Sequence, residues 1–186
     1  LGTLKKLDKN LKKIKIGYFS ADFNNHVVLQ IMADIFKNHD NNKFELYAFS
    51  HGKKEDDSWR NKIKPFFKKF YIINDMDDAQ AVRLARDEKI DIAINLTGIT
   101  KNHRTNIFIK RVAPIQINYL GYPGTMGTKS MDYIIADKII IPEIEKKYYF
   151  EKVKYLPECY IPESKNLFLK ATKNYTRIDF NLPKDK

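Results

Sequence analysis

Cysteine, glycine and proline are scarce in this chain, and each shortage excludes a class of protein. There is one cysteine among the 186 residues, Cys159, so the chain can form neither an internal disulfide nor a multi-cysteine zinc site. A lone thiol is typical of a reducing compartment, and we expect a cytoplasmic protein. Seven glycines and seven prolines form no low-complexity linker. No apolar run approaches the ~20 residues of a membrane span, so we expect no membrane partner.

Acidic residues are also in the minority, since 23 Asp and Glu face 34 Lys and Arg, for a net charge of +11. Such an excess can indicate binding to the phosphates of nucleic acid or of a nucleotide. Nucleic-acid sites, however, tend to use arginine and aromatic residues interleaved with basic ones. Here lysine far outnumbers arginine, and the arginines are scattered. We therefore interpret the charge as a lysine-rich composition and predict no nucleic-acid partner.

Several familiar catalytic motifs are missing. No GxGxxG follows the first predicted strand, which argues against a dinucleotide dehydrogenase, and no P-loop, GxSxG elbow or HExxH helix is present. Two pairs of adjacent carboxylates, at 56–57 and 77–78, stand where helices should begin. We interpret them as helix caps and predict no metal site.

What is present is an alternation of short apolar runs with segments of helical spacing. Strands are expected at 16–20, 44–49, 70–73, 91–96, 114–120 and 133–136, with a possible seventh at 152–156. Helices are expected at 27–36, 57–67, 77–88 and 104–111. Strands separated by helices of this length predict an α/β fold, a Rossmann-like, mostly parallel sheet with helices on both faces.

The two ends of the chain differ from this middle part, residues 15–156. Leu4, Leu7, Leu11 and Ile14 recur at spacings of three and four, which predicts a linker helix over residues 1–14. Residues 157–186 contain three prolines and many polar side chains. They are interpreted as a connecting tail toward a second lobe.

Polar and glycine-rich residues gather where the predicted strands end, and parallel sheets bind ligands at that edge. His26 follows the first strand beside Asp22 and could act as a general base, or simply cap the next helix. The fourth strand leads into Asn95, Thr97, Gly98 and Thr100, with Arg104 behind them, and the fifth strand leads into Gly121, Tyr122, Pro123, Gly124 and Thr125. Taken separately, each of the last two loops is a weak signal for a site, because a helix entry or a tight turn explains it without a ligand.

Taken together, three segments resemble the catalytic region of protein O-GlcNAc transferases. They are Ile16-Gly-Tyr-Phe-Ser-Ala-Asp-Phe-Asn-Asn-His26, Asn95-Leu-Thr-Gly-Ile-Thr100 with Arg104, and Arg111-Val-Ala-Pro-Ile-Gln-Ile-Asn-Tyr-Leu-Gly-Tyr-Pro-Gly-Thr125 continued by Met131-Asp-Tyr-Ile-Ile-Ala-Asp137. The likeness covers residues 15–156 in the same order. One departure is Val27, because the family often has proline after this histidine.

The resemblance implies the N-terminal, acceptor-side lobe of a two-lobed GT-B glycosyltransferase. The implied reaction is inverting, metal-independent transfer of N-acetylglucosamine from UDP-GlcNAc to serine or threonine hydroxyls of an acceptor protein or peptide. His26 matches the family's proposed catalytic histidine. Asp22 and the other loop residues named above would contact substrate. The nucleotide would be held chiefly by the other lobe, so this chain by itself should be inactive, and tetratricopeptide repeats commonly precede the region.

Two alternatives remain open at this point. A stand-alone doubly wound binding or response module would need no second lobe. A related transferase could use another nucleotide sugar, such as GDP-fucose. Binding of UDP, UDP-GlcNAc and GDP-fucose would separate these possibilities.

Overall fold

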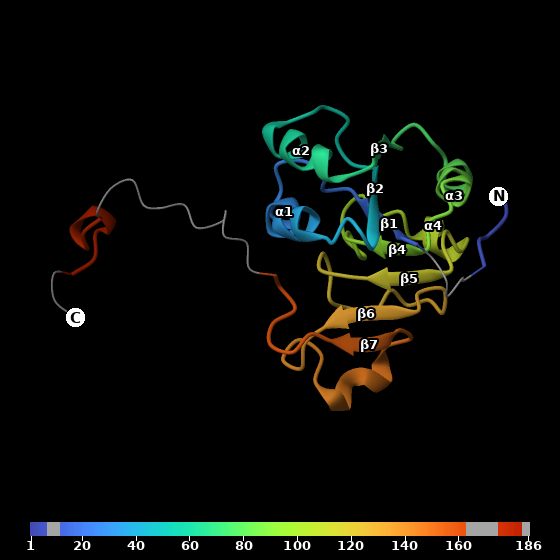
Figure 1. Cartoon of the computed structure of the whole chain (residues 1–186). Helices are drawn as coiled ribbons and strands as arrows, with labels where there is room; N and C mark the ends of the chain where they lie inside the picture. Colours follow the sequence, from blue (N-terminus) through green and yellow to red (C-terminus); the bar gives the residue numbers. More distant parts are fainter. Residues whose placement is uncertain (7–11, 163–174, 184–186) are drawn as a thin grey trace.

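The computed structural model describes residues 1–6, 12–162 and 175–183 and contains one seven-stranded sheet (Figure 1). Its strands are β1 (Ile14–Ser20), β2 (Phe44–Ser50), β3 (Lys69–Ile72), β4 (Ile92–Asn95), β5 (Ile115–Asn118), β6 (Tyr133–Ala136) and β7 (Lys152–Tyr155). They lie in the order β3-β2-β1-β4-β5-β6-β7, and every pairing is parallel. The predicted α/β fold is confirmed, and the seventh strand is present.

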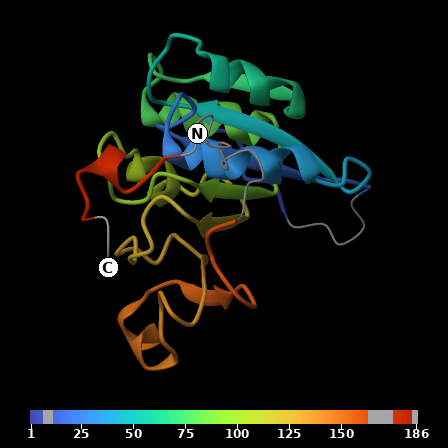
Figure 2. The same cartoon turned by 90° about the vertical axis from the view of Figure 1, so that its left-hand side faces the viewer.

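Helices cover both faces of the sheet, as the alternation predicted. They are α1 (Val27–Asn38), α2 (Ser58–Ile63), α3 (Asp78–Asp87) and α4 (Thr105–Ile109), with short 3₁₀ helices η1 (Lys64–Phe66), η2 (Glu143–Tyr148) and η3 (Ile178–Phe180). Helices α1 and α2 lie on one side of the central strands, and α3 and α4 lie on the other (Figure 1). Figure 2 shows α1 in front of those strands.

Each face has its own hydrophobic core, because alternate residues of a strand point to opposite faces. On the α1 side, Tyr18 and Leu46 pack with Met32 and Phe36. On the α3 side, Phe19 and Phe49 stack with ring centroids 4.4 Å apart and pack with the helix residue Val82 and its neighbours. Strands buried on both faces explain why the first two strands are apolar almost throughout.

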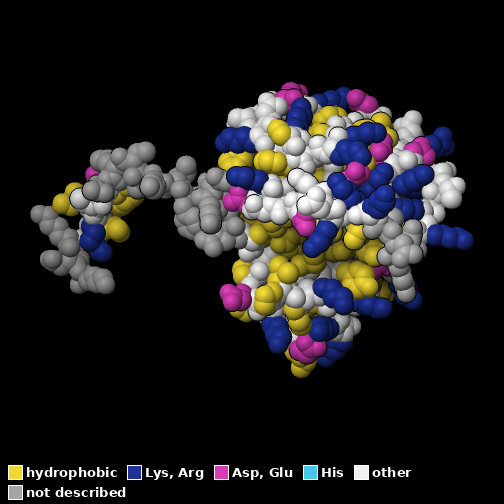
Figure 3. All heavy atoms as spheres, viewed as in Figure 1, with side chains coloured by type: hydrophobic (Ala, Val, Ile, Leu, Met, Phe, Trp, Pro, Cys, Tyr) yellow, Lys and Arg dark blue, Asp and Glu magenta, His cyan; other side chains and the backbone are white. Residues whose placement is uncertain are grey.

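The sheet is less completely covered at β5 and β6. Ile115, Ile117, Tyr133 and Ile135 share one face there and are only half-buried. Figure 3 shows hydrophobic side chains gathered at this level of the molecule, with Lys and Arg side chains spread over the rest of the visible surface.

The N-terminal segment differs from the prediction. Residues 1–6 are not helical, whereas Leu7 and Leu11 lie outside the described residues, and Ile14 already belongs to β1. Gly2 has a φ of +71°, which breaks a helix, and the Nζ of Lys5 lies 2.6 Å from the buried carboxylate of Asp91. This segment is therefore held by polar contacts at the amino edge of the sheet and not by an apolar stripe.

The carboxylate pairs cap helices as expected. Asp77 accepts a hydrogen bond from the Gln80 backbone at 2.8 Å, and the Gln80 side chain accepts one from Asp77 in return, which completes a capping box. Asp57 caps α2. Within the ranges that the structure describes, no three His, Cys, Asp or Glu side chains are grouped as metal ligands would be. Nor is any described helix long and apolar enough to cross a membrane.

Candidate active site

A pocket of about 450 Å³ opens at the carboxyl edge of the sheet. It lies where β1 has β2 on one side and β4 on the other, the switch point at which open α/β sheets bind their ligands. Its lining comes from the loops after β1, β2, β4 and β5 and from the first turn of α1. The lining residues are Ala21, Asp22, Asn24, Asn25, His26, Val28, Lys53, Thr100, Lys101, Asn102 and Gly121.

His26 is at once the cap of α1 and a wall of the pocket. Its Nδ1 accepts a hydrogen bond from the backbone N–H of Val28 at 3.2 Å. Because that lone pair is occupied, the neutral ring carries its proton on Nε2. The side chain is 43% exposed, so a substrate can reach the ring. In this arrangement His26 is ready to donate a hydrogen bond to a substrate oxygen.

Asp22 stands beside His26, with its Oδ1 3.9 Å from Nδ1. That distance is too long for a hydrogen bond, so the two side chains do not form the base-and-orienting-carboxylate pair of a catalytic triad. Burial raises the pKa of Asp22, and the nearby His26 opposes the rise. Burial thus makes Asp22 a stronger proton acceptor than an ordinary aspartate.

The loop after β4 is built around Asn95 and Thr97, and both side chains are buried. The Asn95 Oδ1 accepts from the backbone N–H groups of Thr97 and Gly98 at 3.1 and 3.3 Å. The Thr97 Oγ1 accepts from the Ala21 N–H at 3.0 Å, which joins this loop to the one after β1. These two residues therefore shape the pocket from beneath and do not line it.

Arg104 departs from its predicted role as a substrate contact. Its guanidinium donates to the carboxylate of Asp78 at 2.7 Å and to the carbonyl oxygens of Ile73 and Met76 at 2.9 and 2.8 Å. These bonds tie the loop after β4 to the loop between β3 and α3. Each nitrogen of its guanidinium donates to the protein, and Arg104 does not line the pocket, so these contacts give it a role in loop architecture.

The glycine-rich loop after β5 contributes one pocket residue, Gly121. Tyr122 is 42% exposed, and a Cβ on Gly98 or Gly124 would lie 2.4 or 2.3 Å from its side chain, so both glycines make room for it. Thr125 donates to the buried Glu151 carboxylate at 2.7 Å. Tyr122, Pro123, Gly124 and Thr125 therefore flank the pocket without lining it.

Sequence reasoning singled out neither Lys53 nor Asn102 as a pocket residue. Lys53 follows β2, and this position after a strand was the only feature of the sequence that could have indicated a pocket residue. Asn102 adopts the left-handed conformation, with φ +64°, which asparagine tolerates better than most residues, but this preference does not indicate that a residue lines a pocket. Lys53 and Lys101 give the pocket two cations against the one carboxylate of Asp22.

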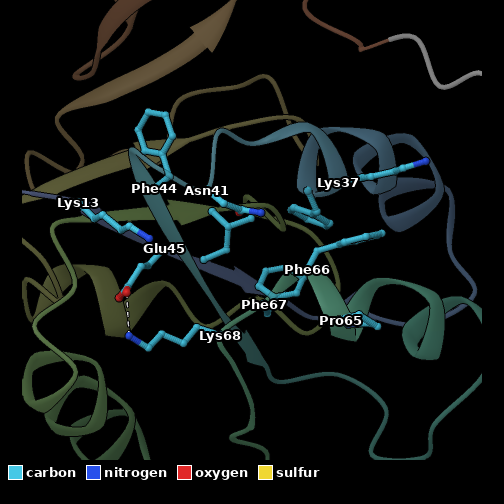
Figure 4. Close-up of a pocket in the computed structure, with 11 residues that line it drawn as sticks. Lys13, Lys37, Asn41, Phe44, Glu45, Pro65, Phe66, Phe67 and Lys68 are labelled. Atoms are coloured by element: carbon cyan, nitrogen blue, oxygen red, sulfur yellow. Dashed lines mark hydrogen bonds and ion pairs between the residues drawn. The ribbon is translucent and has the colours of Figure 1, made fainter.

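A second hollow lies at the opposite edge of the sheet (Figure 4). It has a volume of about 290 Å³ and is bounded by residues of α1, the start of β2 and η1. Its Lys68 is paired with Glu45 at 2.7 Å, the dashed line of Figure 4. Ligands of open parallel sheets bind at the other edge, so we assign no site here.

Comparison with known proteins agrees with this geometry. The family described as glycosyl transferase family 41 matches residues 3–181. This chain belongs to glycosyl transferase family 41. It is 33% identical over 185 residues to the probable UDP-N-acetylglucosamine–peptide N-acetylglucosaminyltransferase SEC of Arabidopsis thaliana, covering 97% of this chain and 19% of that protein. It is 33% identical over 153 residues to the Caenorhabditis elegans UDP-N-acetylglucosamine–peptide N-acetylglucosaminyltransferase, covering 82% and 13%.

A solved structure shows the same fold. A mutant of the Thermobaculum terrenum O-GlcNAc transferase superposes with a TM-score of 0.78 at 26% identity, covering 81% of this chain and 29% of that one. The family 41 chain thus spans less than a third of its relatives' lengths, and its sheet matches a lobe of the glycosyltransferase fold. The resemblance inferred from the three loops is confirmed.

His51, at the end of β2, makes the stability of the lobe depend on pH. Burial lowers its pKa to about 4, with the charge of Arg104 adding to the effect. An unfolded histidine titrates near pH 6.5, so the unfolded state binds the extra proton first as pH falls. We expect the free energy of unfolding to drop by up to roughly 3 kcal/mol between pH 6.5 and 4. Urea titrations at both pH values measure this drop.

The matched variant for this prediction is His51→Asn. Burial also lowers the pKa of His39, so the variant should still lose stability on acidification, but less than the parent. Equal pH dependence of the two proteins would contradict the assignment to His51.

Proposed function

We propose that this lobe is the acceptor side of an enzyme that transfers N-acetylglucosamine from UDP-GlcNAc to serine or threonine hydroxyls of proteins. The observation that supports it most directly is the pocket in which Asp22, His26, Thr100 and Gly121 come together from three separate loops. The relatives named above act on UDP-N-acetylglucosamine and peptides, which supports the same donor and acceptor here.

The proposed reaction is a direct displacement with inversion. The acceptor oxygen forms a bond to the anomeric carbon, and the bond from that carbon to the diphosphate breaks. In the pocket, Asp22 accepts a hydrogen bond from the hydroxyl and takes its proton, while the Nε2–H of His26 donates to a substrate oxygen. Lys53 and Lys101 favour the negative charge that develops on the leaving diphosphate. No step uses a metal ion.

Donor binding tests the function. Isothermal titration of the longer protein that contains this lobe should show binding of UDP and UDP-GlcNAc, whereas GDP-fucose should bind weakly or not at all. The lobe alone is not expected to transfer sugar, because most of the nucleotide contacts would come from a second lobe. Absence of UDP binding to the longer protein would overturn the proposal, and preference for GDP-fucose would reassign the donor.

Replacement of Asp22 tests the proton transfer. Only the ionised form of Asp22 can accept a proton, and burial raises the pKa of this side chain. The rate should therefore fall on acidification at a higher pH than it would with an ordinary aspartate. Asp22→Asn should lower kcat by roughly 10²-fold or more and remove this acid limb. The pH profile of kcat in both proteins measures it. An unchanged acid limb in the variant would exclude Asp22 as the proton acceptor.

A further inference from the structure

A fully buried guanidinium joins two walls of the pocket. Arg60, in the first turn of α2, has no solvent-exposed surface. Its Nε donates to the carbonyl oxygen of Phe23 at 2.5 Å, its Nη1 donates to that of Lys54 at 2.7 Å, and its Nη2 donates to that of Lys53. Phe23 belongs to the loop that carries Asp22 and His26. One side chain therefore fixes the backbone of the β1–α1 loop against the backbone of the β2–α2 loop.

A second contact is made three residues earlier. The Oδ1 of Asp57 accepts from the Arg60 backbone N–H at 2.8 Å and so caps α2. Its other oxygen, Oδ2, accepts from the N–H of Asn25 at 2.5 Å. Asn25 immediately precedes His26, so the loop is held at Phe23 and at Asn25, close to the histidine. The start of α2 therefore determines where the His26 backbone lies.

Burying the Arg60 guanidinium costs free energy, so the contacts that compensate it are needed for the fold of these two loops. A buried cation needs compensation by hydrogen bonds or opposite charge. Three carbonyl dipoles supply most of it, Asp56 lies 3.4 Å away, and the Phe70 ring lies 5.9 Å from the guanidinium carbon. Only arginine has the planar fork of donors that reaches both loops at once, since lysine offers a single point charge.

We propose that Arg60 and Asp57 are positioning residues, which set the loop of Asp22 and His26 against Lys53 across the pocket. Only the activity measurement below rests on the proposed function, because the contacts of Arg60 and Asp57 do not depend on which reaction the pocket performs. A displacement of about 1 Å at a reacting group can cost as much as 10²-fold in rate. Neither residue touches the pocket, so their replacement acts on the reaction only through the loops.

The test uses Arg60→Lys and Asp57→Ser. Lysine keeps the charge but loses the fork, and serine still caps α2 through its hydroxyl but cannot also reach Asn25. The matched control is Arg86→Lys. Arg86 likewise donates to carbonyl oxygens, those of Gly2, Lys110 and Arg111 at 2.9, 2.8 and 2.8 Å, but at the opposite edge of the sheet.

Two readouts separate positioning from a general loss of structure. In ¹⁵N-labelled chain, the ring signals of His26 should move in Arg60→Lys and Asp57→Ser but not in Arg86→Lys. In the longer enzyme, both test variants should lower kcat by about 10-fold or more, with the KM for nucleotide sugar within about two-fold of the parent, because the nucleotide would be held chiefly by the other lobe. Thermal unfolding of all variants shows which remain folded.

Three outcomes of these measurements bear on the positioning role of Arg60 and Asp57. Folded test variants with unmoved His26 signals and a kcat equal to that of Arg86→Lys would overturn the positioning role. If Arg60→Lys does not fold, Asp57→Ser alone decides by the same criteria. A parent enzyme that transfers no sugar would count against the proposed function, and the His26 signals would then decide the positioning question by themselves.

Discussion

Replacement of His26 by alanine should lower glycosyl transfer by about 10²–10³-fold, the usual cost of removing one hydrogen-bond donor that stabilises the transition state. His26 lines the pocket from the start of α1 and is exposed enough to touch substrate. Its loss should leave the fold intact, because the side chain supplies one cap bond, to Val28, and replacing an N-cap residue with alanine typically costs about 1 kcal/mol. The measurement is kcat of the longer enzyme, with thermal unfolding of the variant as control.

A second substitution distinguishes the two roles that a histidine can have. With Nδ1 bonded to Val28, the neutral ring offers Nε2–H as a donor. Glutamine also offers an N–H donor but cannot serve as a base at neutral pH. We therefore expect His26→Gln to retain at least about 10-fold more activity than His26→Ala. Equal loss in both variants would favour the base over the donor, and wild-type turnover in His26→Ala would reject any catalytic role.

The architecture was readily predictable from the sequence. Strands such as β1 and β2 are apolar almost throughout because both faces are covered, and that pattern, alternating with helical spacing, predicts a parallel sheet. The caps at Asp57 and Asp77 were predictable because they are local contacts, closed within three residues. Contacts between residues that are close in the chain can be inferred from a single sequence.

The site was predictable only in part, because pockets depend on contacts between distant segments. Asp22 and His26 were found since they follow a strand. Arg104 was assigned to substrate, but its partners are the carbonyls of the β3–α3 loop, some 30 residues away, and nothing in its own neighbourhood indicates them. Arg60 was overlooked for a similar reason, since an arginine in a short helix is ordinarily exposed.

The spacing of Leu4, Leu7, Leu11 and Ile14 shows the opposite error, because it predicted a helix over residues 1–6, which are not helical. Spacings of three and four favour a helix, but Gly2 is left-handed and Lys5 reaches the buried Asp91. A partner for a lysine 86 residues further along the chain cannot be inferred from periodicity. Over residues 1–6, tertiary contacts thus override the local preference for a helix.

Replacement of Gly121 by alanine should strongly destabilise the fold and should also disrupt the pocket. A Cβ at this position would lie 2.0 Å from the carbonyl oxygen of Leu96 and 3.0 Å from that of Thr97. Both are backbone atoms of the loop after β4, so relief requires that the two loops move apart. Forced overpacking of this kind typically costs about 1–3 kcal/mol, and we expect the upper part of that range from urea unfolding of the chain.

Gly127→Ala in the same loop is the matched control. Gly127 has a φ of +64° but nothing within 4 Å of its missing Cβ, so alanine there should cost only the conformational strain, about 1–2 kcal/mol. Because Gly121 lines the pocket and Gly127 does not, only Gly121→Ala should also lower transfer by the longer enzyme. If Gly121→Ala proved no more destabilising than Gly127→Ala, close packing of the two loops could not be what holds this wall of the pocket in place.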